Sequence, residues 1–187
     1  MNQKTLYTRV AKTLRDARDK MNDSGKHWTQ GKLAESILGE IGVMRYCSIG
    51  GINAALDVPQ VYVETTRLIR EDEPPDEDAD DEERALAWAW ADGTKDVIDV
   101  LDVLDATKLL LADVIIGNPP EAVTSWYLST ETGVEQTNEA ESIIIRHNDQ
   151  DATFDESSGG SLSQKVGWAI VEAKFMEAAD AADKLAA

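Results

Sequence analysis

Residues 96–116 have the sequence DVIDVLDVLDATKLLLADVII, in which aspartate followed by two apolar residues recurs every three positions. At 100° per residue, carboxylates spaced by three cover one half of a helix, and valine and leucine occupy the other half. A helix that is apolar nearly all round is central in a bundle or lies at an oligomer interface. The stretch therefore predicts a long helix that organises the fold and ends at Gly117, before Pro119 and Pro120.

Amphipathic helices are predicted near both ends of the chain. In residues 4–21, apolar side chains recur at helical spacing and basic side chains occupy the opposite face. That basic face is either solvated or in contact with an acidic surface, in this chain or in another copy. Near the C-terminus, Ser161 and Gln164 form a capping box before a helix with two apolar stripes, which implies two packing partners.

The remaining segments have weaker patterns. Residues 27–56 predict a second helical region interrupted by glycines, and residues 121–129 predict a short helix. Residues 130–139 are polar and predict a loop, whereas the isoleucines that follow suit either a strand or the end of a helix. The predicted fold is mostly α: a compact bundle of about six helices, forming a single domain over residues 1–187, with a long acidic loop.

Composition and charge exclude several classes of function. The chain has 187 residues with 36 acidic and 18 basic side chains, a net charge of −18, which argues against direct binding of nucleic acid. No apolar run is long enough to cross a bilayer and the N-terminus has no signal pattern, so we expect a cytoplasmic protein without a membrane partner. One cysteine excludes an internal disulfide, and two histidines leave little for a zinc site, so no cofactor is expected.

The most acidic segment lies between residues 71 and 83, where ten of thirteen residues are acidic. These residues are Glu71, Asp72, Glu73, Asp76, Glu77, Asp78, Asp80, Asp81, Glu82 and Glu83. Such a run repels itself and buries no apolar surface, so it predicts a mobile loop. The loop serves either solubility or the attraction of a basic partner surface.

Cys47 is the sole thiol, and two interpretations of it remain open. A cysteine nucleophile needs a base, and His147 followed by Asn148 could supply a base and the group that orients it. The order Cys, His, Asn occurs in cysteine hydrolases. Alternatively, a free cysteine beside Tyr46 and Ile49 is a small core residue.

Two further features admit a functional and a structural interpretation. Asp99 and Asp102 could share a metal ion, but aspartates spaced by three diverge around a helix, which favours a solvated face. Tryptophan is large and apolar, so we expect the tryptophans to be core anchors. They stand at positions 28, 88, 90, 126 and 168.

Two stretches of the chain carry a resemblance. The first is WTQG at residues 28–31 followed by RYCSIGGINAA at residues 45–55, and the second is IRHND at residues 145–149, then Thr153 and the terminal helix. Together they resemble a family of small uncharacterised proteins of actinobacteria and their phages. The resemblance implies that Trp28, Cys47 and Asn148-Asp149 meet in one small helical core. It also implies that residues 71–137 are an insertion between the two shared pieces.

The resemblance bears on function in two ways. His147 stands where the family usually has an aromatic residue, which argues against His147 as a catalytic base. A phage origin implies an accessory role directed at the host, by association only.

These observations predict a non-enzymatic protein that works through protein contacts. Its acidic surface would engage a basic host surface, including one that normally holds nucleic acid. A homodimer is predicted, because the helix over residues 95–116 has more apolar surface than one neighbour covers and the basic N-terminal helix offers a face of opposite sign. The alternatives are a hydrolase that uses Cys47 and His147, and a structural component.

Overall fold

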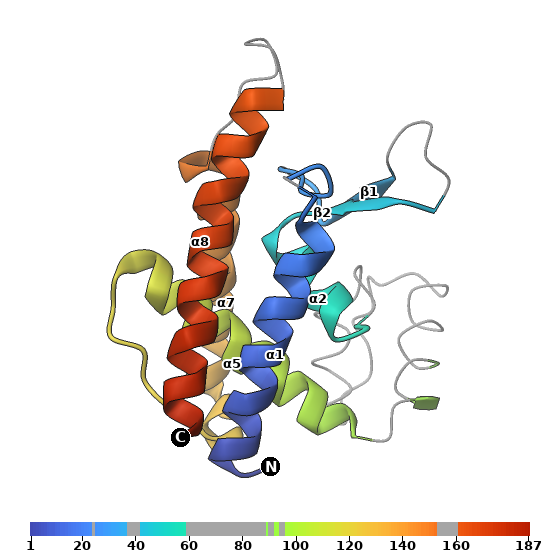
Figure 1. Ribbon diagram of the computed structural model, residues 1–187. Coiled ribbons are helices and arrows are strands. Elements are labelled where there is room, and N and C mark those ends of the chain that lie inside the picture. Colours follow the sequence, from blue (N-terminus) through green and yellow to red (C-terminus); the bar gives the residue numbers. More distant parts are fainter. Residues whose placement is uncertain (24, 37–41, 59–88, 90–91, 94–95, 153–160) are drawn as a thin grey trace.

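The computed structural model describes residues 1–23, 25–36, 42–58, 89, 92–93, 96–152 and 161–187 (Figure 1). The protein is mostly helical, which confirms the predicted fold class. The acidic run at 71–83, which we predicted to be a mobile loop, lies outside the described residues.

The elements follow one another along the chain with the labels of Figure 1. They are α1 (Gln3–Met21), β1 (Ala34–Ser36), β2 (Met44–Tyr46), α2 (Ser48–Ala55), α5 (Val97–Ile116), α6 (Ser125–Leu128), α7 (Glu131–Arg146), the single π-helical turn η1 (His147–Asp151) and α8 (Ser161–Ala186). β1 and β2 form an antiparallel hairpin in which Glu35 faces Arg45.

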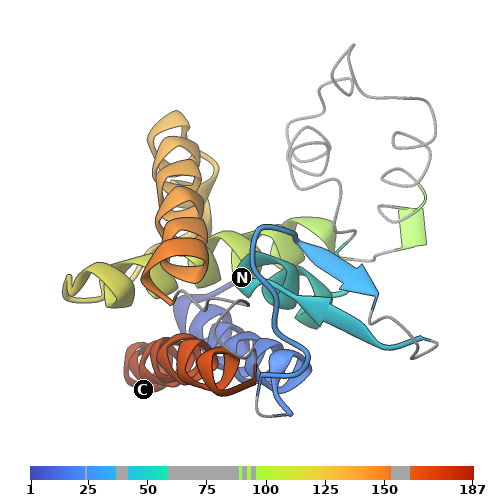
Figure 2. The ribbon, with the colours of Figure 1, turned by 90° about the horizontal axis from the view of Figure 1, so that it is seen from above.

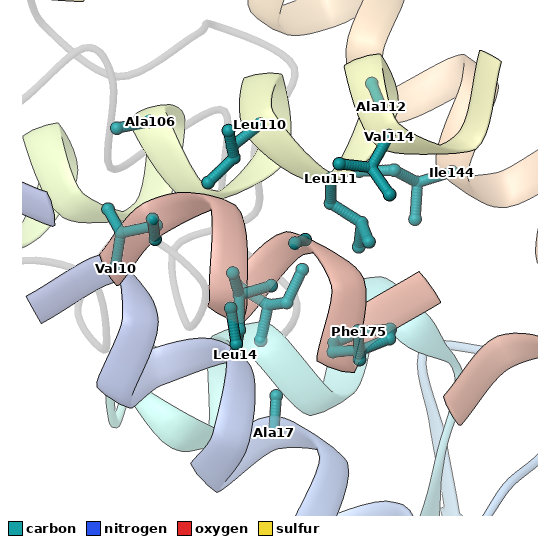
Figure 3. Close-up of a cluster of buried hydrophobic side chains, with 14 of the residues drawn as sticks. Val10, Leu14, Ala17, Ala106, Leu110, Leu111, Ala112, Val114, Ile144 and Phe175 are labelled. Atoms are coloured by element: carbon teal, nitrogen blue, oxygen red, sulfur yellow. The ribbon is translucent and has the colours of Figure 1, made fainter. Parts of the chain in front are cut away.

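Helix α5 is the middle layer of the bundle. Figure 2 shows it between the side-by-side helices α1 and α8 and the helix α7, and it packs against all three. Its leucines, alanines and valines meet Val10 and Leu14 of α1, Ile144 of α7 and Phe175 of α8 in one buried cluster (Figure 3). Gly117 ends the helix in the left-handed conformation, with φ of 78°. The predicted central helix is therefore confirmed, and its neighbours belong to the same chain.

The stretch predicted as an insertion, residues 71–137, contains α5 and the first half of α7. The middle layer of the bundle thus lies within it, and residue 137 falls inside a continuous helix. Nothing in the fold marks a boundary at that position, and the insertion stays a prediction.

The basic face of α1 meets acidic side chains of α8. Arg15 lies 2.5 Å from a carboxylate oxygen of Asp183 and 3.7 Å from one of Asp180, and Arg18 lies 3.6 Å from Glu172. The guanidinium of Arg15 lowers the pKa of the Asp183 carboxyl by a hydrogen bond and by its charge. Of the two interpretations of the basic face, the structure shows contact with an acidic surface within the same chain.

Residues 27–56 do not form the predicted helical region. They contain the hairpin and the short helix α2, which begins at Ser48 among the glycines that were expected to interrupt the helical region. A Cβ on Gly50 would lie 1.8 Å from the carbonyl oxygen of Leu33, so the first turn of α2 packs directly on the hairpin backbone. The glycine that suggests a helix break is required by this close approach.

Residues 131–139 are helical, so the predicted loop at 130–139 is wrong. Thr130 caps α7 by accepting a hydrogen bond from the backbone N–H of Gly133 at 3.1 Å. The polar side chains lie largely on the exposed face of this helix, while Thr137, Ala140 and Ile144 are buried. The short helix expected at 121–129 covers four residues only, those of α6.

The aspartates of α5 do not form a solvated face. Asp102 is only 1% exposed and Asp105 is also buried, because the middle turns of α5 have neighbours on all sides. Lys108 on the same helix is completely buried, and its ammonium lies 2.9 Å from a carboxylate oxygen of Glu141 on α7. The middle layer therefore holds charges as well as leucines.

We predict that Glu141→Gln destabilises the protein by about 1–3 kcal/mol, because it leaves the buried ammonium of Lys108 without the carboxylate that it contacts. Glu139→Gln on the exposed face of α7 is the matched control and should change the free energy of unfolding by less than about 0.5 kcal/mol. Urea unfolding followed by circular dichroism measures both. Equal stability of the two variants would show that the ion pair contributes nothing.

Candidate functional site

The side-chain amide of Asn148 joins three segments that are distant in sequence. Its Oδ1 accepts hydrogen bonds from Trp28 Nε1 at 2.8 Å and from the backbone N–H and hydroxyl of Ser48 at 3.1 and 2.9 Å. Its Nδ2 donates to the carbonyl oxygen of Thr29 at 3.1 Å and to Asp149 Oδ1 at 2.7 Å. Asn148 is buried and its amide uses both donor hydrogens, so this side chain is a structural hub.

The local sequence places Asn148 at the hub by widening the last turn of α7. The backbone N–H of Ala152 donates to the carbonyl oxygen of His147 at 3.0 Å, which closes the π-helical turn η1. Gln30 fixes the turn from outside, since its Nε2 donates to the carbonyl oxygens of Asn148 and, at 3.2 Å, of Ala152. The turn between α7 and the following segment is therefore held by residues of the hairpin region.

Trp28 completes the hub from the apolar side. Its ring lies 6.5 Å from the ring of Trp168, at an interplanar angle of 46°, and both rings are buried. The prediction of tryptophan core anchors is thus confirmed for these two residues. It is wrong for Trp126, which is 77% exposed, and Trp88 and Trp90 lie outside the described residues.

A small pocket of about 190 Å³ adjoins the hub. Cys47, Asn148 and Asp149 contribute to its lining, and the backbone N–H of Gly31 donates to Asp149 Oδ1 at 3.0 Å on its rim. The structure therefore brings Trp28, Cys47 and the Asn148-Asp149 pair together, as the resemblance implies.

Cys47 is poorly suited to nucleophilic catalysis. Its sulfur caps α2 by accepting a hydrogen bond from the backbone N–H of Gly50 at 3.4 Å, and the residue is only 6% exposed. Burial raises the pKa of the thiol to about 11, and this effect exceeds the opposing influence of the backbone hydrogen bonds. At neutral pH the group is a thiol rather than the thiolate that attacks a carbonyl.

His147 does not serve as a base for Cys47 in this arrangement. Among the described residues no hydrogen bond joins the two side chains, and His147 is not one of the residues that line the pocket. Burial lowers the pKa of His147, opposed by the charge of Asp151. Of the three residues of the hydrolase alternative, Cys47 and Asn148 line one pocket and His147 is not part of that lining.

The other sequence-predicted sites are separated or lie outside the described residues. Asp99 lies 3.6 Å from the N-terminal ammonium and 3.8 Å from Arg9, whereas Asp102 is buried in the middle layer. In the part of the chain that the structure describes, no three His, Cys, Asp or Glu side chains gather as a metal site would require. The ten acidic residues of 71–83 are not described.

Sequence reasoning missed Ser48 and Gln30, whose side chains complete the hub. Gln30 lies within the WTQG stretch and Ser48 follows Cys47, so both adjoin motifs that the analysis singled out. A polar residue next to a buried motif is a signal, because its side chain can satisfy buried backbone groups. The partner atoms, however, belong to Asn148, which lies 100 positions from Ser48 and 118 from Gln30.

None of the described helices combines the length and apolar character needed to cross a bilayer. Comparison with protein-family models, with curated proteins and with solved structures gives no match to this chain.

We predict that Asn148→Ala destabilises the protein by at least about 3 kcal/mol, because it leaves several buried donors and one buried carbonyl without their partner. Gln150→Ala in the same turn is the control, since Gln150 is exposed, and should change stability by less than about 0.5 kcal/mol. Thermal and urea unfolding measure the difference. A stable Asn148→Ala variant would show that the hub is dispensable.

We also predict that iodoacetamide alkylates Cys47 slowly in the native protein at pH 7. Because burial raises the pKa of this thiol to about 11, the rate should keep rising with pH well above pH 9. Mass spectrometry of quenched samples gives the rate, and the urea-unfolded chain provides the unperturbed reference. Fast alkylation with an apparent pKa below 7 would contradict the structural role and favour the hydrolase alternative.

Proposed function

We propose that this protein is a non-enzymatic interaction protein whose acidic surface binds a basic surface of another protein. The observation that carries the proposal is that cations are paired within the chain while acids are left on its surface. Eight cations of the described residues lie beside acids of the same chain, while a row of acids on α7 has no ion pair among the described residues.

The internal pairing of cations is extensive. Within the described ranges, eight basic side chains lie within 4.0 Å of a carboxylate of this chain: Arg9, Lys12, Arg15, Arg18, Lys32, Arg45, Lys108 and Lys174. A cation held in this way contributes little to attracting a negatively charged partner. The charge that the chain presents outward is therefore the excess of its 36 acids over its 18 bases.

The acidic row on α7 consists of Glu131, Glu135 and Glu139, which are all exposed. Their spacing of four places them on one face of the helix, about 6 Å apart along its axis. Like charges at this spacing destabilise an isolated helix by about 0.2–0.5 kcal/mol per pair. A basic partner surface laid along the row would convert this repulsion into attraction.

The acidic segment 71–83 extends the proposal to residues that the structure does not describe. We propose that its ten carboxylates attract the same basic surface over a longer range. A protein surface that normally holds nucleic acid has the required charge, and a phage accessory protein acting on its host would meet such surfaces in the cytoplasm. These parts of the proposal rest on charge and on the family resemblance.

The homodimer stays a prediction, and the fold removes both of its reasons. The apolar surface of α5 is covered by helices of the same chain, and the basic face of α1 is matched by α8. The thiol of the hydrolase alternative is not activated, and among the described residues no hydrogen bond joins Cys47 to His147. The alternative of a structural component receives no support from a specific contact.

The proposal is tested with a synthetic peptide of about twenty residues rich in lysine and arginine, at about 150 mM salt, where the Debye length is about 8 Å. Replacing Glu131, Glu135 and Glu139 by Gln should weaken the affinity about tenfold, because three ion pairs of up to about 1 kcal/mol each are lost. Fluorescence anisotropy of the labelled peptide gives both dissociation constants.

The control variant carries Asp57→Asn, Asp92→Asn and Asp96→Asn, three exposed acids away from α7. It changes the net charge by the same amount and should weaken binding less than threefold. Equal weakening of the two variants would mean that only net charge matters. Absence of binding by the unmodified protein would overturn the proposal.

A further inference from the structure

A cleft of about 680 Å³ opens between the C-terminal half of α5, the extended segment that follows it and the helices α6 and α7. In Figure 1 the extended segment and α6 are the yellow part of the chain, on the side of the bundle away from the hairpin. The volume lies within the range of about 300–1,000 Å³ that is usual for ligand sites. The residues that line the cleft include two carboxylates and no basic side chain.

The first distinctive feature of the cleft is Trp126, whose ring lines it although the residue is 77% exposed. The helix that carries it is held firmly on both sides. Its backbone is fixed at Tyr127, whose carbonyl oxygen accepts the hydroxyl of Thr130 at 2.7 Å, and Leu128 beside it is fully buried. A Cβ on Gly133 would lie 2.1 Å from the same carbonyl oxygen, so α7 packs tightly against α6. Trp126 is thus an exposed aromatic residue on a helix whose backbone is held in place.

The extended segment that leads to α6 is also fixed. The hydroxyl of Tyr7 on α1 accepts a hydrogen bond from the backbone N–H of Val123 at 2.7 Å and donates to the carbonyl oxygen of Glu121 at 3.3 Å. Tyr7 is buried, so these bonds attach the extended segment to the core of the bundle. A cleft with two fixed walls loses little conformational freedom when a ligand enters.

The second distinctive feature is the carboxylate of Asp113 on α5, which is partly buried in the cleft. Burial raises the pKa of this carboxyl, and the negative charge of Glu121 adds to the effect, opposed by a hydrogen bond from the side chain of Asn118. No ion pair to Asp113 occurs among the described residues. A cation that entered the cleft would stabilise the ionised carboxylate.

We infer that this cleft binds an arginine side chain presented by a basic protein. The inference rests on the proposed function and names the contact by which the acidic surface selects its partner. Arginine fits better than lysine, because its planar guanidinium stacks on an indole ring and donates two parallel hydrogen bonds to a carboxylate. Trp126 supplies the ring, Asp113 and Glu121 supply the carboxylates, and the remaining volume accepts the peptide backbone beside the arginine.

The test compares an arginine-rich peptide with a lysine-rich peptide of the same length and charge, at about 150 mM salt. The unmodified protein should bind the arginine peptide at least about fivefold more tightly, measured by fluorescence anisotropy. Trp126→Ala should abolish this preference, and Asp113→Asn should weaken arginine binding about tenfold. Ile98→Ala is the matched control, because Ile98 is apolar, 59% exposed and outside the cleft lining, and it should change neither affinity.

A second measurement separates this inference from the proposed function. In the ¹H–¹⁵N spectrum, the indole N–H signal of Trp126 is identified as the one that disappears in Trp126→Ala. N-acetyl-arginine amide should shift this signal, and N-acetyl-lysine amide should shift it less. If peptides bind but arginine has no advantage and Trp126→Ala binds normally, the cleft is not the contact, while the proposed function stands. If the arginine amide shifts the signal but neither peptide binds, the proposed function fails. The cleft is then a site for the free guanidinium group only, and the inference that it binds an arginine presented by a protein is wrong.

Discussion

The middle turns of α5 have no side that faces solvent, and the remaining structure depends on this constraint. Each face of the helix needs a cover, which α1 and α8 provide on one side and α7 on the other. Because Lys108 is among the covered residues, the cover must also contain a carboxylate, and Glu141 places one 2.9 Å from its ammonium. An ammonium without a partner at that depth would destabilise the fold by several kcal/mol. The pair therefore specifies how α7 is aligned on α5.

The amide of Asn148 imposes a second alignment, just beyond the C-terminal end of α7. By binding Trp28 and Ser48 it ties the end of α7 to the hairpin and to the start of α2. The conspicuous residues of the sequence are thus explained by packing: Cys47 caps a helix, Asn148 joins segments, and Gly50 allows α2 to approach the hairpin. A motif of Cys, His and Asn along the chain is not a catalytic arrangement unless the fold brings all three together.

The sequence predicts the elements whose patterns are long and local, and misses those that depend on distant partners. Helix α5 and the helices at both ends follow from periodicity over some twenty residues each. Gln164, predicted to close a capping box with Ser161, instead donates from Nε2 to the carbonyl oxygens of Gly25 at 2.8 Å and Trp28 at 3.3 Å. The hairpin was missed because its strands have three residues each and are stabilised by bonds such as that from Cys47 N to Leu33 O. The burial of Asp102 was missed because periodicity describes one helix and does not count its neighbours. Of the candidate site, the sequence predicts the meeting of Trp28 with Asn148 through the resemblance, but gives no sign of the cleft beside Trp126.

The features left over after these packing requirements are the ones that suggest function. Eight of the described cations are paired with acids elsewhere in the chain, and none of the described cations pairs with the acidic row on α7. The fold also buries Trp28 and Trp168, so the exposure of Trp126 is not explained by a shortage of core positions. In the protein alone, neighbouring exposed acids lower the stability of their helix by repulsion. An exposed indole ring lowers solubility because its apolar surface is hydrated. Both effects are reversed by the same partner, because a basic protein neutralises the acids and a guanidinium covers the ring. A single class of ligand therefore accounts for two features that the fold itself does not require.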